Sequence, residues 1–281
     1  MKFWSNSKHG RYTQGVDSVA AAVRFPQMLG LSCALLVAMA LTGSPLARAD
    51  VAHYRAKVVE KVATERRNYV QGLEIDGNRL LISAGLYGES AVRAYGWPSM
   101  ELQQEQLLPR RFFAEGLTRV DDRIYLLTWR ARTLLVLDAA TLAPVGQAAL
   151  PGEGWGITHH GSRIWFSDGS DRLFTTDTST DEALQIIEVR RDGRPVYRLN
   201  ELEWINGEIW ANVYMTNEIV RIDPKSGVVT GVIELTGLLA AEDRKPDTDV
   251  LNGIAHDPST GAVWVTGKRW PWLFRIELEE H

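Results

Sequence analysis

The 281-residue sequence contains one cysteine, Cys33, and no apolar run as long as the roughly 20 residues that a membrane-spanning helix needs. A single cysteine excludes a disulfide framework and a zinc site built on thiolates. The two signs of charge nearly balance, because 35 acidic residues against 31 basic ones leave a formal net charge of −4. That balance gives no reason to expect nucleic acid or an anionic membrane surface as a partner.

Motifs for metal binding and nucleophilic catalysis are also missing. The sequence has no H-E-x-x-H pattern, no G-x-S-x-G elbow and no glycine loop of the kind that cradles phosphate. The histidines are scattered apart from His159-His160, which falls in a predicted hairpin turn and is expected to be exposed. We therefore expect neither a metal nor a cofactor.

The composition is that of a globular chain with ample material for a core, since 45% of the residues are hydrophobic and 23% are charged. These fractions exclude a disordered, collagenous or coiled-coil chain. Ten tryptophans and 24 glycines are an excess that requires a structural explanation.

Residues 1–49 have the pattern of a secretory leader. A basic start precedes an apolar run over 28–41, and Ala47-Arg48-Ala49 supplies a small-residue cleavage site. The alternative is an uncleaved membrane anchor, but the run is too short to span a bilayer. We expect cleavage, a mature domain over 50–281, and an exported protein, periplasmic or secreted, that keeps no stable membrane association.

The mature sequence repeats one pattern five times, with starts between 40 and 52 residues apart. Each copy has a short signature, a turn and a strand-like run, and further short strands follow. About four strands per roughly 45 residues is the period of a β-propeller blade. The five signatures begin at Gln71, Glu115, Trp155, Asn200 and Asn252, and the strand-like runs after their turns are Arg79–Ser83, Arg123–Thr128, Arg163–Ser167, Glu208–Val213 and Ala262–Thr266.

The predicted fold is therefore all-β, a single five-bladed β-propeller. The last unit has only Leu273–Leu278 after Lys268, whereas the strand-like stretch Tyr54–Ala63 precedes the first unit. We expect this N-terminal strand to join the C-terminal blade and close the ring, because closure removes exposed strand edges. Spacing alone also permits a β-sandwich, but the common register of five copies disfavours that fold.

The repeat register predicts a site. In a propeller the innermost strands line a central channel, so equivalent positions converge at one mouth. The first residues of the five signatures form one such set. The second set, one hairpin strand later, is Gly85, Trp129, Gly169, Tyr214 and Lys268. Together the two sets supply a carboxylate, an ammonium group, three carboxamides and three large aromatic rings, a mixture that suits a pocket for a small ligand.

Structural alternatives exist for each member of this set. Trp129 and Trp155 could be core residues, and the carboxamide side chains could form turns, plug the channel or satisfy backbone groups. Glu115 and Lys268 could form a structural ion pair. Inward-pointing charges are costly unless they are paired or used, so these two are the strongest candidates for function.

The motifs at these positions are long and ordered along the chain from about Tyr69 to Leu278. They include Gln71-Gly72-Leu73, Glu115-Gly116-Leu117-Thr118, Leu199-Asn200-Glu201-Leu202-Glu203, Leu251-Asn252-Gly253-Ile254-Ala255 and Thr266-Gly267-Lys268. In them the sequence resembles the plant and bacterial type of glutaminyl-peptide cyclotransferase, a five-bladed propeller family unrelated to the zinc-dependent animal enzyme. The resemblance implies conversion of an N-terminal glutaminyl residue of a peptide or protein to pyroglutamate, with release of ammonia.

The resemblance also implies roles for individual residues. Glu115 takes the position of the family's acid/base carboxylate. The polar pocket positions fall on Gln71, Asn200 and Lys268, and the aromatic walls on Trp129 and Trp155. The sequence departs from the family pattern at Tyr69-Val70, at Ile82-Ser83, and at Tyr214, where the family usually has tryptophan.

Our hypothesis makes Glu115 the proton shuttle, with Lys268 and Asn200 as further catalytic residues that polarise the γ-carbonyl or hold the oxyanion. The predicted substrate-binding residues are Gln71, Trp129, Trp155, Tyr214 and Asn252. The chain is expected to act as a monomer. Two alternatives stay open: a non-catalytic propeller that binds peptide or protein at the same mouth, and a lactonase-like hydrolase, which a single carboxylate in the ring disfavours.

Overall fold

A computed structural model describes residues 50–180 and 182–280. The predicted leader lies outside the described residues, so its cleavage stays a prediction. The described part consists of twenty-two β-strands and one short 3₁₀ helix, η1 (Ala241–Asp243), which confirms the all-β prediction. Within these ranges no helix has the length and apolarity needed to cross a bilayer.

Three sheets share one topology, in which four consecutive strands pair antiparallel as a meander. A two-stranded ribbon of β14 (Arg190–Arg191) and β15 (Arg194–Pro195) follows the third of them. The strands of the three sheets are β2 (Val70–Asp76), β3 (Arg79–Ala84), β4 (Ala91–Gly96) and β5 (Leu102–Leu107); β6 (Ala114–Val120), β7 (Arg123–Thr128), β8 (Thr133–Asp138) and β9 (Pro144–Ala149); and β10 (Ile157–His160), β11 (Arg163–Ser167), β12 (Arg172–Asp177) and β13 (Gln185–Glu188).

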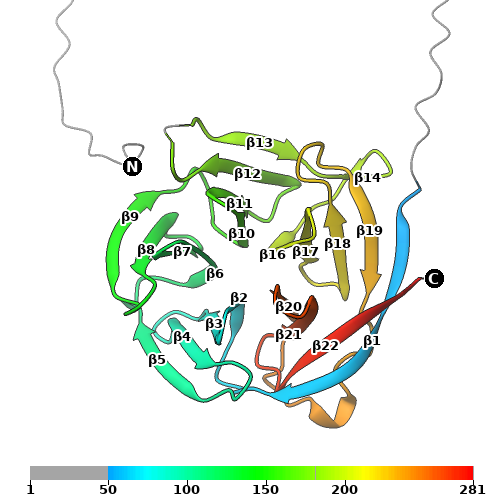
Figure 1. The fold of residues 1–281 in the computed structure, drawn as a ribbon, viewed down its shortest axis with the longest axis horizontal. Helices are drawn as coiled ribbons and strands as arrows, with labels where there is room; N and C mark the ends of the chain where they lie inside the picture. Colours follow the sequence, from blue (N-terminus) through cyan, green and yellow to red (C-terminus); the bar gives the residue numbers. More distant parts are fainter. Residues whose placement is uncertain (1–49, 181, 281) are drawn as a thin grey trace, which may run out of the picture. The chain divides into compact units, whose positions relative to one another are not determined.

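The fourth sheet has eight strands and contains both ends of the described chain. Its N-terminal strand β1 (Ala52–Ala63) pairs parallel with β19 and antiparallel with the C-terminal strand β22, from Tyr54 opposite Glu280 to Ala63 opposite Trp272. Figure 1 shows β1 running between those two strands. The sequence predicts this pairing of the first and last strands. In spatial order the sheet contains β16 (Leu199–Ile205), β17 (Glu208–Val213), β18 (Glu218–Ile222), β19 (Val229–Glu234), β1, β22 (Trp272–Glu280), β21 (Ala262–Gly267) and β20 (Leu251–Asp257).

The strands β2, β6, β10, β16 and β20 lie nearest the common centre of the sheets (Figure 1). Contacts join β2 to β6, β6 to β10, β10 to β16, β16 to β20, and β20 to β2. The strands β2, β6, β16 and β20 are buried along most of their length and β10 along its first half, whereas β5, β9 and β13 on the outside are largely exposed. Apolar side chains of adjacent sheets pack face to face, as Leu81 and Val92 do in one cluster with Leu117 and Leu126.

Glycine at the second signature position allows the inner strands to approach closely. A Cβ added at Gly156 would overlap the carbonyl oxygen of Asn200, and one at Gly116 would lie 2.8 Å from the Cα of Gly156. The fourth unit has Glu201 at this position instead. Its carboxylate accepts hydrogen bonds from the backbone N–H groups of Leu73 at 3.3 Å and Ile254 at 2.9 Å. One buried side chain thus links three of the inner strands.

We expect Gly156→Ala to lower the free energy of unfolding by about 3 kcal/mol or more, because the overlap is with rigid backbone that cannot move aside. Gly146→Ala is the matched control, since its Cβ would meet Val136 at an ordinary 3.7 Å. Urea denaturation of both variants measures the difference. Equal stability of the two variants would contradict the close approach described here.

Candidate functional site

A cavity of about 200 Å³ lies at the end of the inner strands where their signatures begin. Its walls come from the first residues of those strands and from the residues just after the strands that follow them. The lining residues are Tyr69, Gln71, Leu86, Phe113, Glu115, Trp129, Trp155, Asn200, Tyr214 and Lys268.

Seven of the eight residues that the sequence analysis selects for the site line this cavity: Glu115, Lys268, Asn200, Gln71, Trp129, Trp155 and Tyr214. The eighth, Asn252, is fully buried and is not part of the wall. Its amide nitrogen donates to the backbone carbonyl of Val70 at 3.1 Å and to Oε1 of Gln71 at 3.4 Å. The structure therefore places Asn252 behind Gln71, where it orients that side chain.

Glu115 is the carboxylate of the wall and is only 6% exposed. Burial raises the pKa of its carboxyl well above the ordinary value; the Lys268 ammonium opposes this shift and the charge of Glu153 adds to it. Among the described residues, its side chain accepts one hydrogen bond, from Nε2 of Gln71 at a long 3.4 Å. A weakly bonded carboxyl with a raised pKa can exchange a proton with a ligand.

Lys268 faces the same cavity and is 4% exposed. Its Nζ lies 5.1 Å from the ring centroid of Tyr69 and 5.0 Å from that of Tyr214, within the range of cation–π attraction. Burial lowers the pKa of the Lys268 ammonium, and the charges of Glu115 and Asp249 oppose that change. Among the described residues Nζ makes no ion pair and no hydrogen bond, so its N–H groups are available to a ligand. Lys268 and Glu115 therefore do not form the structural ion pair that the sequence left open as an alternative.

One carboxylate fixes the two tryptophan walls. Oε2 of Glu153 accepts the indole N–H of Trp129 at 2.7 Å and that of Trp155 at 3.1 Å. Trp155 also packs edge-on against Tyr214, with ring centroids 5.6 Å apart. The aromatic side of the cavity is therefore held by hydrogen bonds as well as by packing.

The structure adds residues that sequence reasoning missed. Tyr69 and Phe113 line the cavity, and the Tyr69 hydroxyl donates to Asp249. A signal for Phe113 was present in the second set of repeat positions, where Gly85 and Gly169 lack side chains. A Cβ at Gly85 would overlap the Phe113 ring, and one at Gly169 would lie 2.6 Å from the Trp155 ring. Glycine at these positions makes room for a ring from elsewhere in the chain.

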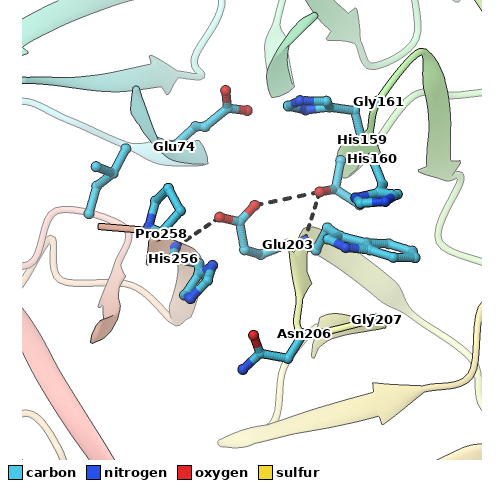
Figure 2. Close-up of a pocket in the computed structure, with 12 residues that line it drawn as sticks. Glu74, His159, His160, Gly161, Glu203, Asn206, Gly207, His256 and Pro258 are labelled. Atoms are coloured by element: carbon cyan, nitrogen blue, oxygen red, sulfur yellow. Dashed lines mark hydrogen bonds between the residues drawn. The ribbon is translucent and has the colours of Figure 1, made fainter. Parts of the chain in front are cut away.

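A second cavity, of about 440 Å³, lies at the opposite end of the inner strands (Figure 2). Its side chains join neighbouring strands by hydrogen bonds. Glu203 accepts from the backbone N–H of His256 at 2.8 Å, and the hydroxyl of Thr158 accepts from the backbone N–H of Trp204 at 2.8 Å. Figure 2 shows Glu203 between His256 on one side and His159 and His160 on the other. The polar side chains that line this cavity thus join one inner strand to the next by hydrogen bonds.

The same role falls to Glu74, which accepts hydrogen bonds from the Thr118 hydroxyl at 2.6 Å and the Arg119 backbone N–H at 3.1 Å. The Thr118 hydroxyl also lies 2.7 Å from Nδ1 of His159. The expectation that His159 is exposed in a turn is therefore wrong: it lies in β10, is half-buried, and burial lowers the pKa of its imidazole. His160, the next residue, is exposed as expected.

Three buried carboxyl groups at and above this second cavity have raised pKa values. Burial raises the pKa of Glu74 to about 7 and the pKa values of Glu201 and Glu203 well above the ordinary range. The charge of Asp76 adds to the shift of Glu74, and the charge of Glu74 adds to the shifts of the other two. Within 50–180 and 182–280 no lysine or arginine forms an ion pair with them, and no group of three His, Cys, Asp or Glu side chains is placed to hold a metal ion.

Comparison with known proteins links the chain to one group. A sequence model of the family described as glutamine cyclotransferase matches residues 31–278. A glutaminyl-peptide cyclotransferase of Arabidopsis thaliana is 37% identical over 240 residues, which cover 82% of this chain and 74% of the relative. The crystal structure of Myxococcus xanthus glutaminyl cyclase superposes with a TM-score of 0.75 at 30% identity, covering 83% of this chain and all of that one.

The raised pKa of Glu74 makes stability depend on pH. A carboxyl whose pKa is higher in the folded state stabilises the fold below its ordinary pKa, and this contribution is lost as pH rises toward 7. Between pH 4.5 and 7 we expect the free energy of unfolding of the wild type to fall by about 3 kcal/mol relative to Glu74→Gln. Urea titrations across this range measure it. Parallel curves would contradict it, and Glu101→Gln on the surface serves as control.

Proposed function

The chain belongs to the glutamine cyclotransferase family, and we propose that the cavity around Glu115 and Lys268 is where it cyclises its substrate. The enzyme is a glutaminyl-peptide cyclotransferase: it converts an N-terminal glutaminyl residue of a peptide to pyroglutamate and releases ammonia. The observation that carries the proposal is that a carboxyl and an ammonium group share one small buried cavity without pairing with each other. Both groups are therefore available to the substrate.

The reaction is an intramolecular acyl transfer. The α-amine nitrogen of the substrate attacks the side-chain carboxamide carbon, a new N–C bond closes the five-membered ring, and the bond to the amide nitrogen breaks. Because the two reacting groups belong to one residue, the protein has to fix their conformation rather than bring two molecules together. The rings of Trp129, Trp155 and Tyr214 restrict the glutaminyl chain and keep water out of a cavity of about 200 Å³.

Proton transfer falls to Glu115. As a carboxylate it accepts the proton that the attacking amine loses, and as a carboxylic acid it gives that proton to the leaving nitrogen, so ammonia departs rather than an amide anion. Burial raises the pKa of this carboxyl, which favours the protonated form that gives the proton to the leaving nitrogen. The Lys268 ammonium nearby disfavours a second positive charge and so favours the neutral, reactive form of the amine.

The carboxamide of the substrate needs stabilisation as its carbonyl oxygen becomes negative. The ammonium of Lys268 has free N–H groups aimed into the cavity and is the donor for this oxyanion. Asn200 is 2% exposed and its Oδ1 has no hydrogen-bond partner in the described chain. An unpartnered amide oxygen favours an acceptor role toward a substrate N–H, and Gln71, held by Asn252, completes the polar wall.

The fold on which this site is built is a five-bladed propeller, with β1 closing the ring in the blade of β20, β21 and β22. The cyclic order of contacts among the inner strands and the pairing of β1 with β22 support it. In this arrangement each of the five signatures opens one inner strand. A crystal structure in which β1 lies apart from β22 would contradict it.

The enzyme is exported, acts outside the cytoplasm and loses residues 1–49 on the way. The basic start, the apolar run and Ala47-Arg48-Ala49 support this. We expect the protein recovered from the periplasm or medium of an expressing bacterium to begin at Asp50, as measured by intact mass. Recovery of the full-length chain in the membrane fraction would contradict cleavage.

We expect Glu115→Gln to reduce kcat for ammonia release from Gln-initiated peptides about 10²- to 10⁴-fold, because the variant keeps the hydrogen bond to Gln71 but cannot carry a proton. Lys268→Met, which keeps an apolar stem of similar length, is expected to lower kcat about 10²- to 10³-fold because the oxyanion donor is missing.

The kcat/KM of the wild type should rise with pH through the raised pKa of Glu115, because the carboxylate form accepts the proton. Unchanged rates in Glu115→Gln would remove Glu115 from the mechanism, and binding of Gln-peptides without turnover by the wild type would favour a binding module.

A further inference from the structure

A line of aromatic rings leads from the cavity to the surface. Phe113 and Trp129 line the cavity, and both contact Tyr87, which is 49% exposed. The ring centroid of Tyr87 is 5.4 Å from that of Phe113 and 6.4 Å from that of Trp129, to which it lies nearly parallel at 29°. We call these three residues the aromatic shelf. A peptide whose first residue fills the cavity has an apolar surface here on which its next residue can lie.

The three loops that supply the shelf are rich in arginine. These are residues 85–90, 108–113 and 129–132, and they carry one acidic residue, the exposed Glu89. Their basic residues are Arg110, Arg111, Arg130 and Arg132, all exposed. Such a concentration stands out in a chain whose formal net charge is −4.

Two of these arginines lie against the shelf or next to it. The guanidinium carbon of Arg130 is 4.0 Å from the ring centroid of Trp129. The guanidinium of Arg110 lies 3.5 to 3.6 Å from where a Cβ of Gly88 would stand, beside Tyr87. Neither forms an ion pair with another described residue. Glu153, a carboxylate close to Trp129, accepts hydrogen bonds from the indole N–H groups of Trp129 and Trp155.

Resting on the proposed function, we infer that the residue after the N-terminal glutamine lies on the aromatic shelf, and that Arg110 and Arg130 select an acidic side chain there. A planar guanidinium binds a carboxylate through two parallel hydrogen bonds, and it repels a lysine at the same place. Charges at the rim of a site contribute more to specificity and association rate than to affinity. The substrate class is therefore Gln-initiated peptides with Asp or Glu at the second position.

The test compares two amidated peptides, Gln-Glu-Ala and Gln-Lys-Ala, by ammonia release. Amidation removes the terminal carboxylate that would otherwise compete for the arginines. For the wild type at low salt we expect kcat/KM to be at least about fivefold higher for the glutamyl peptide. In 1 M salt, where the Debye length is about 3 Å, the ratio should fall toward one.

The double variant Arg110→Gln/Arg130→Gln is expected to bring the low-salt ratio to within about twofold of one. Arg55→Gln, which removes an exposed arginine on β1, is the matched control and should keep the wild-type ratio. A wild-type ratio near one, or an undiminished ratio in the double variant, would overturn the inference while leaving the cyclotransferase activity in place. Failure to release ammonia from either peptide would instead contradict the proposed function and the inference with it.

Discussion

The close approach of the inner strands is the constraint on which the rest of the molecule depends. At Gly116 and Gly156 no side chain fits between the neighbouring backbones, so the inner strands lie very close together there. The unit with Glu201 in place of this glycine is joined by hydrogen bonds to two other inner strands. The first residue of each signature comes just before this close approach, so the first side chains of the signatures lie near one another. The cavity of Glu115 and Lys268 is at that end of the strands.

Burial shifts the pKa values of charged side chains at both ends of the inner strands. At the first end it raises the pKa of Glu115 and lowers that of Lys268, and in each case the charge of the other group opposes the shift. At the second end it raises the pKa values of Glu74 and Glu203, whose carboxylate oxygens accept hydrogen bonds from backbone N–H groups of the neighbouring strand. The same physical effect therefore acts in both cavities, and the carboxylates of the second cavity also join neighbouring strands by hydrogen bonds.

Support for the site comes from residues that do not face the substrate. Asn252 orients Gln71, Glu153 holds both tryptophans, and Asp249 accepts the hydroxyl of Tyr69, whose ring stands beside the Lys268 ammonium. The contacts of Asn252 with Gln71 and of Asp249 with Tyr69 join residues about 180 positions apart, and that of Glu153 with Trp129 joins two different loops. The side chains that line the cavity are therefore held in place by their neighbours, which is the preorganisation that an active site requires.

The repeat of the signatures predicted an all-β chain and the end of the inner strands at which the site residues gather, because period and register are local properties that repeated copies reinforce. It placed seven cavity residues together and anticipated the pairing of β1 with β22. Only the tertiary structure decided which way side chains turn: it put Asn252 behind the wall, brought Phe113 and Tyr69 into it, and half-buried His159. Those outcomes depend on contacts between units, such as the hydrogen bond between Asn252 and Gln71, and the spacing of residues within one unit does not define such contacts.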